Sequence, residues 1–173
     1  MAFGASPVRG IRGSRYRNLV GRIVVGVDGS EGGQAALRFA LEEARLRGAA
    51  LHVVHAWKLP LYEGVPGAFV LAGPLEPTPP LDEVRQALQD AAERVVEDAL
   101  RDVAGDGAAD LEVHREVVEA APARALIAFA EGADLLVVGS RGRGGFLGLR
   151  LGSVSSQCTH HAPCPVVIVP HTR

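Results

Sequence analysis

Residues 134–153 read DLLVVGSRGRGGFLGLRLGS and combine an apolar run, a glycine-rich turn and a helix start. The run Leu135–Val138 has the length and the apolar character of a buried strand. Gly139 permits a tight turn after that strand, and Gly142 permits the backbone to approach a ligand closely. The pair Gly152-Ser153 places bare backbone N–H groups and a hydroxyl at the start of a helix. This stretch therefore predicts a cradle for a phosphate group.

Strands and helices alternate along the rest of the chain. Short apolar runs predict strands at Arg22–Asp28, Leu51–Ala56, Leu111–Val118, Leu135–Val138 and Val166–Val169. Periodicity and capping residues predict helices from Ser30 to Gly48, from Asp82 to Val103, from Pro122 to about Glu131 and from Gly152 to about His161. This alternation favours an α/β fold with a single open, twisted sheet of five parallel strands and helices on both faces, a Rossmann-like α/β/α sandwich.

Two of the predicted helices carry an apolar stripe, and a long loop precedes the second one. The first stripe consists of Leu37, Ala40, Leu41 and Ala44, and the second of Val84, Leu88, Ala91, Val95, Ala99 and Val103. The loop from about Leu59 to Pro80 is rich in proline and glycine. It is long enough to be either a lid or a surface excursion.

A carboxylate accompanies the glycine turn. Ligands of open parallel sheets bind beyond the carboxyl ends of the strands, where Asp28 and the turn at Gly139 are expected. Asp28 would repel a bare phosphate, but it could accept hydrogen bonds from ribose hydroxyls while the phosphates lie further along the loop. The pair therefore favours a nucleotide. Asp28 could alternatively cap the helix that begins near Ser30, or bind Mg²⁺.

The glycine turn does not match two common nucleotide-binding loops. No Gly-Lys-Ser/Thr follows it, which excludes a P-loop, and no G-x-G-x-x-G follows the first strand, which excludes the dinucleotide fingerprint. Arg141 and Arg143 could pair with phosphate oxygens or form a solvated basic rim, and for Arg150 the rim is the favoured interpretation.

Other reactive side chains give no pattern of a catalytic or metal site. The cluster Cys158, His160, His161 and Cys164 lacks the spacing of common zinc sites. His52 and His55 alternate with apolar residues on a predicted strand, so one of them is expected to face the pocket, where packing is the favoured role. No base is tied by motif to Ser153, so no catalytic residue is expected and hydrolysis of a bound nucleotide would be weak at most.

Composition bounds the class of protein. The 173 residues are 47% hydrophobic and 22% charged, which excludes wholesale disorder and suits one domain. A net charge of -2 gives no general case for nucleic acid binding, and no apolar run is long enough for a membrane helix. Residues 1–19 are expected to form a flexible basic extension to a domain at 20–173. Two cysteines and no export signal predict a cytoplasmic protein.

From about Val20 to Pro170 the chain resembles the nucleotide-binding branch of the universal stress protein family. The family signature is Gly, two residues, Gly, nine residues, then Gly followed by Ser or Thr, and Gly139, Gly142, Gly152 and Ser153 fit it in full. The segments Val27–Ser30 and His161–Pro170 also resemble the family. The resemblance implies a sandwich of five parallel strands that binds ATP, with or without Mg²⁺, and forms a homodimer through Val166–Val169.

The resemblance also implies roles for single residues. Asp28 and Gly139 would hold the ribose, and Gly26 and Ala56 would line the adenine pocket. Gly142, Gly152, Ser153 and the backbone at Val154 would hold the phosphates. The remaining expected nucleotide-binding residues belong to the same loop and are Ser140, Arg141, Arg143 and Gly144. One departure is Ala120-Ala121-Pro122, where many members have Gly-x-Pro. The added methyl group is expected to alter that turn.

These features lead to one main hypothesis and two alternatives. The main one is an ATP-binding regulator or sensor in a stress response that acts on a protein partner which the sequence does not identify. The alternatives are a slow ATPase or nucleotide-transforming enzyme, and a dimeric interaction module that binds no nucleotide. Adenine nucleotides other than ATP remain open.

Overall fold

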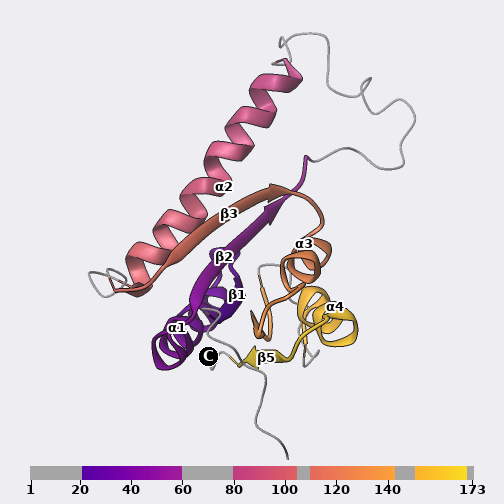
Figure 1. Ribbon diagram of the computed structural model, residues 1–173. Helices are drawn as coiled ribbons and strands as arrows, with labels where there is room; N and C mark the ends of the chain where they lie inside the picture. Colours follow the sequence, from indigo (N-terminus) through magenta and orange to yellow (C-terminus); the bar gives the residue numbers. More distant parts are fainter. Residues whose placement is uncertain (1–20, 60–79, 105–109, 143–150, 171–173) are drawn as a thin grey trace, which may run out of the picture.

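The computed structural model describes residues 21–59, 80–104, 110–142 and 151–170. Within these ranges the chain forms β1 (Arg22–Gly26), α1 (Glu31–Arg47), β2 (Ala50–Trp57), α2 (Leu81–Ala104), β3 (Val113–Glu119), α3 (Pro122–Phe129), β4 (Leu135–Gly139), α4 (Ser153–His161) and β5 (Val166–Val169). All neighbouring strands pair in parallel, in the order β3-β2-β1-β4-β5 (Figure 1). The predicted fold class is confirmed.

Several predicted features lie outside the described residues. They are the N-terminal extension at 1–19, nearly all of the loop between Leu59 and Pro80, and the residues Arg143, Gly144 and Arg150.

Helices cover both faces of the sheet (Figure 1). On one face α1 and α2 pack on buried side chains that include Ile23, Val25, Leu51 and Val137. On the other face α3 and α4 pack on the alternate residues of the same strands, which include Val24, Val54 and Leu136. A strand with both faces buried reads as a continuous apolar run, and this explains why the central strands were visible in the sequence.

The first helix forms as its sequence predicts. The Ser30 hydroxyl caps it by accepting the backbone N–H of Gly33 at 3.1 Å, and Gly48 ends it in the left-handed conformation at φ 62°. All four residues of the predicted stripe are at most 2% exposed.

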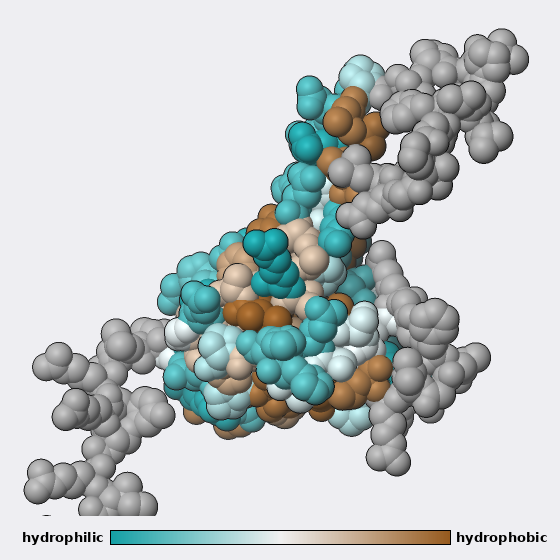
Figure 2. All heavy atoms as spheres, turned by 90° about the vertical axis from the view of Figure 1, so that its right-hand side faces the viewer, coloured by the Kyte–Doolittle hydropathy of each residue, from teal (hydrophilic) through white to brown (hydrophobic). Residues whose placement is uncertain are grey.

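The predicted stripe of α2 is partly wrong. The buried positions are Ala92, Val96, Ala99 and Leu100, whereas Ala91 is exposed. The first half of this 24-residue helix extends beyond the main body (Figure 1), so its apolar residues meet fewer neighbours. Figure 2 shows apolar surface on this projecting end, where Leu81 is 56% exposed. Periodicity therefore identified the helix but could not identify which face the sheet would cover.

The strand order reverses between β1 and β4. The chain enters the sheet at its centre, adds β2 and β3 on one side, and then adds β4 and β5 on the other. The connection after β1 leads to α1 on one face, while β4 is followed by α4 on the opposite face. A crevice consequently forms beyond the ends of these two strands, where open α/β sheets bind ligands.

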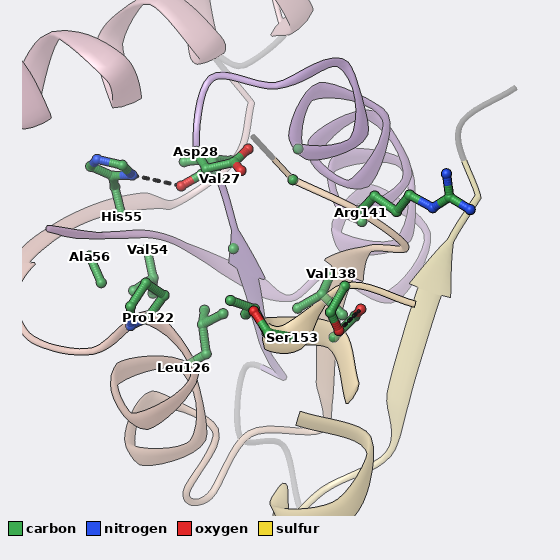
Figure 3. Close-up of a pocket in the computed structure, with 17 residues that line it drawn as sticks. Val27, Asp28, Val54, His55, Ala56, Pro122, Leu126, Val138, Arg141 and Ser153 are labelled. Atoms are coloured by element: carbon green, nitrogen blue, oxygen red, sulfur yellow. Dashed lines mark hydrogen bonds between the residues drawn. The ribbon is translucent and has the colours of Figure 1, made fainter. Parts of the chain in front are cut away.

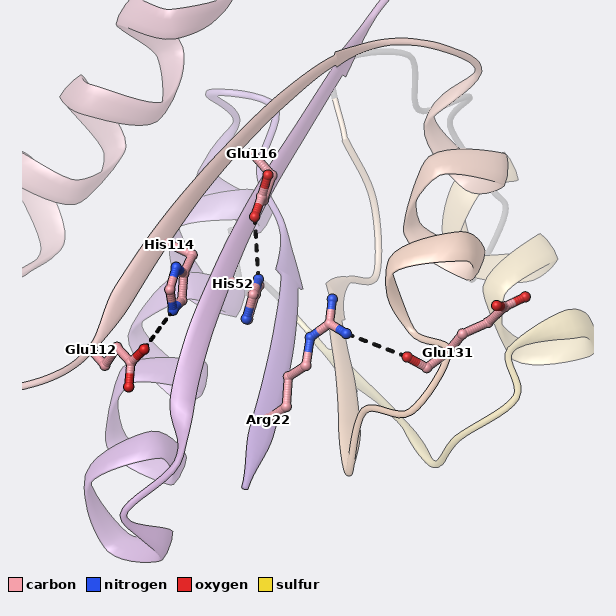
Figure 4. Close-up of polar contacts among 6 residues, drawn as sticks. All are labelled: Arg22, His52, Glu112, His114, Glu116 and Glu131. Atoms are coloured by element: carbon pink, nitrogen blue, oxygen red, sulfur yellow. Dashed lines mark hydrogen bonds and ion pairs between the residues drawn. The ribbon is translucent and has the colours of Figure 1, made fainter. Parts of the chain in front are cut away.

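A ladder of polar side chains crosses the α3/α4 face of the sheet near the start of its strands (Figure 4). The rings of His52 and His114, directly paired across β2 and β3, stack with centroids 4.4 Å apart. His52 Nδ1 lies 3.4 Å from a carboxylate oxygen of Glu116, and His114 Nε2 lies 2.9 Å from Glu112. Arg22, on β1, approaches the backbone carbonyl of Glu131 at 3.4 Å.

The environment of His52 lowers the pKa of its imidazole below the ordinary value of 6.5. Burial is the largest cause, followed by repulsion of the protonated form by Arg22 and His114, and Glu116 opposes the shift. Because the unfolded chain keeps the higher pKa, it binds the proton more tightly. His52 therefore reduces the free energy of unfolding as the pH falls below 6.5 towards the lowered value.

We expect His52→Gln to flatten this pH dependence. Between pH 8 and pH 5 the urea midpoint of the wild-type protein should fall more than that of the variant, because glutamine does not titrate. The exposed His161→Gln variant is the control and should keep the wild-type profile. Parallel profiles for wild type and His52→Gln would show that His52 does not couple protonation to unfolding.

Candidate functional site

A cavity of about 360 Å³ lies in the crevice beyond β1 and β4 (Figure 3). Its size falls within the usual range for small-molecule sites. The walls come from the ends of β1, β2 and β4 and the starts of α1, α3 and α4. The lining residues are Gly26, Val27, Asp28, Gly33, Val54, His55, Ala56, Pro122, Leu126, Val138, Gly139, Arg141, Gly142, Gly152, Ser153, Val154 and Ser155.

The turn between β1 and α1 fixes the position of Asp28. One carboxylate oxygen, Oδ1, accepts hydrogen bonds from the backbone N–H of Ser30 at 3.0 Å and from the Ser30 hydroxyl. Gly29 turns the chain at φ 75°, which a residue with a side chain rarely adopts. Ser30, not Asp28, caps α1. Asp28 thus orients the capping residue with one oxygen, while its other oxygen lies on the side of Gly142.

The loop after β4 packs directly on the first turn of α1. A Cβ atom added to Gly139 would lie 2.6 Å from the carbonyl oxygen of Gly32, and one added to Gly32 would collide with the carbonyl oxygen of Arg141. A Cβ atom on Gly142 would collide with Asp28 Oδ2. The sequence predicted a close approach of Gly142 to a ligand, and the close approach that the structure shows at this residue is to Asp28.

Hydrogen bonds join the two halves of the glycine motif. The carbonyl oxygen of Ser140 accepts the backbone N–H of Gly152 at 2.8 Å and the hydroxyl of Ser155 at 3.0 Å. The Ser155 hydroxyl also lies 3.0 Å from the Gly152 carbonyl oxygen. Ser155 is 1% exposed, so these contacts are shielded from water. Ser140, at the start of the loop after β4, and Gly152 and Ser155, at the start of α4, consequently form one hydrogen-bonded unit.

The start of α4 is open to a ligand. Gly152 is its N-cap and makes no side-chain capping hydrogen bond. The first-turn N–H groups and the Ser153 hydroxyl lie at the cavity wall, where the positive end of the helix favours an anion. This arrangement suits a phosphate group.

Another part of the lining is apolar and suits a flat ring. It consists of Val54, Ala56, Pro122, Leu126 and Val138 (Figure 3). Gly26 lies behind this wall, since a Cβ atom there would be 2.8 Å from a Leu126 methyl group. At the departure from the family pattern, the Ala120 N–H donates to the Trp57 carbonyl oxygen at 2.9 Å. No described residue other than glycine has a positive φ, so Ala120 fits this turn in an ordinary conformation.

Most of the predicted site residues line one cavity. They are Gly26, Asp28, Ala56, Gly139, Arg141, Gly142, Gly152, Ser153 and Val154. Ser140 contributes through its backbone, as described above. The Arg141 side chain extends away from the cavity towards β5 (Figure 3), so its backbone is the part that faces the site. Arg143 and Gly144 lie outside the described residues.

Sequence reasoning did not assign Gly32, Gly33 or Ser155 to the site, and it left open which of two histidines faces it. Gly32 and Gly33 carried a signal, because two glycines in the first turn of a helix weaken it unless something approaches closely. The two histidines lie three residues apart on β2, so they face opposite sides of the sheet. His55 is the one that lines the cavity. Ser155 carried no signal in the sequence.

The cysteine and histidine cluster at the end of α4 does not converge. Cys158 is fully buried in the core, and burial raises the pKa of its thiol to about 11. Cys164 follows the helix and lies near the Pro165 carbonyl oxygen. Among the described residues, no three His, Cys, Asp or Glu side chains are placed to hold a metal ion.

Comparisons with known proteins agree with this architecture. A sequence profile of the Universal stress protein family matches residues 20–170. A universal stress protein of Mycobacterium tuberculosis is 39% identical over 149 residues, which cover 85% of this chain and 46% of that protein. The chain thus spans about half the length of the curated relatives it matches.

Two solved structures extend the comparison to ligands. A universal stress protein solved in complex with cAMP is 26% identical, with a TM-score of 0.58 and coverage of 88% of this chain and 98% of that one. The universal stress protein of Archaeoglobus fulgidus, solved in complex with dAMP, is 25% identical, with a TM-score of 0.50 and coverage of 87% and 99%.

We expect Gly139→Ala to destabilise the protein by about 1–3 kcal/mol, because its methyl group would press on the backbone of Gly32. The neighbouring Ser140→Ala is the control, since Ser140 contributes its carbonyl oxygen to the unit. It should change the free energy of unfolding by no more than about 0.5 kcal/mol. Urea denaturation measures both. Equal effects of the two substitutions would contradict the close packing of the loop on α1.

Proposed function

This chain belongs to the universal stress protein family, and we propose that it binds ATP or another adenine nucleotide and acts as a nucleotide-dependent regulator in a stress response. The observation that carries the proposal is the unit formed by the Ser140 carbonyl and the start of α4. It presents backbone N–H groups to the same cavity that Asp28 and the apolar wall line.

Each part of the cavity matches one part of a nucleotide. The apolar wall around Ala56 and Leu126 would pack on the base. The Asp28 carboxylate would accept hydrogen bonds from the ribose hydroxyls, and the backbone at Gly139 would also contact the ribose. The phosphates would lie along Gly142 and against Gly152, Ser153 and the N–H of Val154, where the helix end favours negative charge.

The family neighbours support the ligand class and leave the phosphate number to experiment. The structures that contain cAMP and dAMP hold one phosphate each, and they belong to other proteins. ATP is the ligand we propose here because Gly139, Gly142, Gly152 and Ser153 together fit the full signature of the nucleotide-binding branch of the family. Any Mg²⁺ would then be held mainly by the triphosphate oxygens, with Asp28 the nearest carboxylate in the cavity.

A regulator needs a surface that a partner protein can bind. β5 is an edge strand whose four β-branched residues are all only partly buried. An exposed edge of this kind tends to pair with another strand. We therefore propose that the chain forms a homodimer through Val166–Val169, and that nucleotide binding alters the surface that a regulatory protein contacts.

The proposal also covers the cellular compartment of the protein and the bounds of its nucleotide-binding domain. Both cysteines are unpaired, which is typical of a reducing compartment such as the cytosol. In the part of the chain that is described, no helix is both long and apolar enough to cross a membrane. The described residues that line the cavity lie between Gly26 and Ser155. We propose that residues 20–173 form the nucleotide-binding domain and that binding does not require residues 1–19.

We expect Gly152→Val to weaken ATP binding by at least about tenfold, because its methyl groups would occupy space at the phosphate position. The fold should survive, since a Cβ atom there meets nothing closer than 3.6 Å. Isothermal titration with ATP and Mg²⁺ measures the affinity, and AMP and cAMP are titrated in parallel. His161→Ala, at the exposed end of the same helix, is the control.

Either of two results would reject the binding proposal. One is a folded wild-type protein that binds none of the three nucleotides. The other is a Gly152→Val protein that binds ATP as tightly as the wild type.

We expect ATP to slow hydrogen exchange at residues 139–142 and 151–155, because a ligand that bridges the two segments reduces their opening. The exchange of β3, at the far edge of the sheet, is the internal control. Bound ATP with unchanged exchange in these segments, and an unchanged dimer by light scattering, would remove the regulatory part of the proposal and leave binding alone.

A further inference from the structure

We propose that His55 is a positioning residue for nucleotide binding, which holds Asp28 in place through the carbonyl group of Val27. This inference rests on the proposed function, because Asp28 is the carboxylate assigned there to the ribose. His55 does not belong to the glycine motif, so this role is additional to those of the motif residues.

The hydrogen bond itself defines the state of the ring. His55 Nδ1 lies 2.7 Å from the carbonyl oxygen of Val27 (Figure 3). A carbonyl oxygen can only accept, so Nδ1 must carry the proton and donate it. In the neutral ring Nε2 is then unprotonated, because the hydrogen bond of one ring nitrogen selects the tautomer.

The bond holds the chain directly after the last residue of β1. β1 ends at Gly26, and Val27 is the next residue. The Val27 N–H donates to the Val54 carbonyl oxygen at 3.0 Å, and the Val27 carbonyl oxygen accepts from His55. Both polar groups of Val27 are thus held by neighbouring residues of β2. Val27 is 5% exposed, so loss of the ring would leave a poorly hydrated carbonyl group.

Asp28 follows directly and is held from its other side by Ser30. The carboxylate accepts from the backbone and the hydroxyl of Ser30, while the peptide before Asp28 is fixed through His55. Removal of either anchor would allow the turn to shift. The anchor at His55 also adjoins Ala56, so it ties the ribose side of the cavity to the base side.

Three variants test the proposal by titration with the nucleotide that the wild type binds. His55→Leu should weaken affinity by about tenfold, which corresponds to about 1.4 kcal/mol. His55→Asn should recover most of this loss, because its amide N–H can reach the position of Nδ1. In an Asp28→Ala background His55→Leu should cost less than about twofold, since the residue that it positions is absent.

A nitrogen-15 NMR measurement of the imidazole tests the hydrogen bond without any nucleotide. At a pH where the ring is neutral, the spectrum of the wild-type protein should show His55 protonated at Nδ1. Protonation at Nε2 instead would overturn the proposal, as would equal losses for His55→Leu in the wild-type and Asp28→Ala backgrounds.

The outcomes separate this inference from the proposed function. If the wild type and His55→Leu bind nucleotide equally well, the function stands and the role of His55 is rejected. If the wild type binds no adenine nucleotide, the proposed function fails, and the positioning role fails with it even when the NMR spectrum shows the Nδ1 proton.

Discussion

Backbone lies against backbone where the loop after β4 meets the first turn of α1, and the site depends on that contact. Gly139 and Gly32 make it possible, because a Cβ atom on either would press on the other segment. The approach brings a segment near residue 140 beside a turn near residue 30. Without it, Asp28 and the glycine motif would be two separate features at neighbouring strand ends. With it, they face one cavity.

The proposed phosphate cradle also consists mainly of backbone groups. Ser140 acts there through its carbonyl oxygen, Gly152 through its N–H, and only Ser155 contributes a side chain. Backbone groups have little freedom once their neighbours are packed, so such a cradle is already ordered before a ligand arrives. An ordered site of backbone N–H groups suits a phosphate, and in the proposed function the adjoining apolar wall would contact the base.

The two histidines of β2 lie on opposite faces of the sheet and have different roles. His52 lies on the α3/α4 face among Arg22, His114 and Glu116, where its protonation affects stability. His55 lies at the end of the strand and contacts the turn that carries Asp28. Three residues separate them in sequence, and an odd separation in a strand places side chains on opposite faces. Stability and ligand positioning are consequently carried by different histidines of one strand.

The sequence by itself determined the fold class, the element order and most of the residues of the candidate site. Strands buried on both faces are continuous apolar runs, Ser30 and Gly48 are local capping signals, and the glycine spacing is a local property of the chain. Only the tertiary structure decided which face of α2 is buried, that Gly32 and Gly33 belong to the site, that Ser155 joins the two halves of the motif, and which histidine reaches Val27. Each of these depends on contacts between segments far apart in the chain, and such contacts leave no period or spacing within either segment.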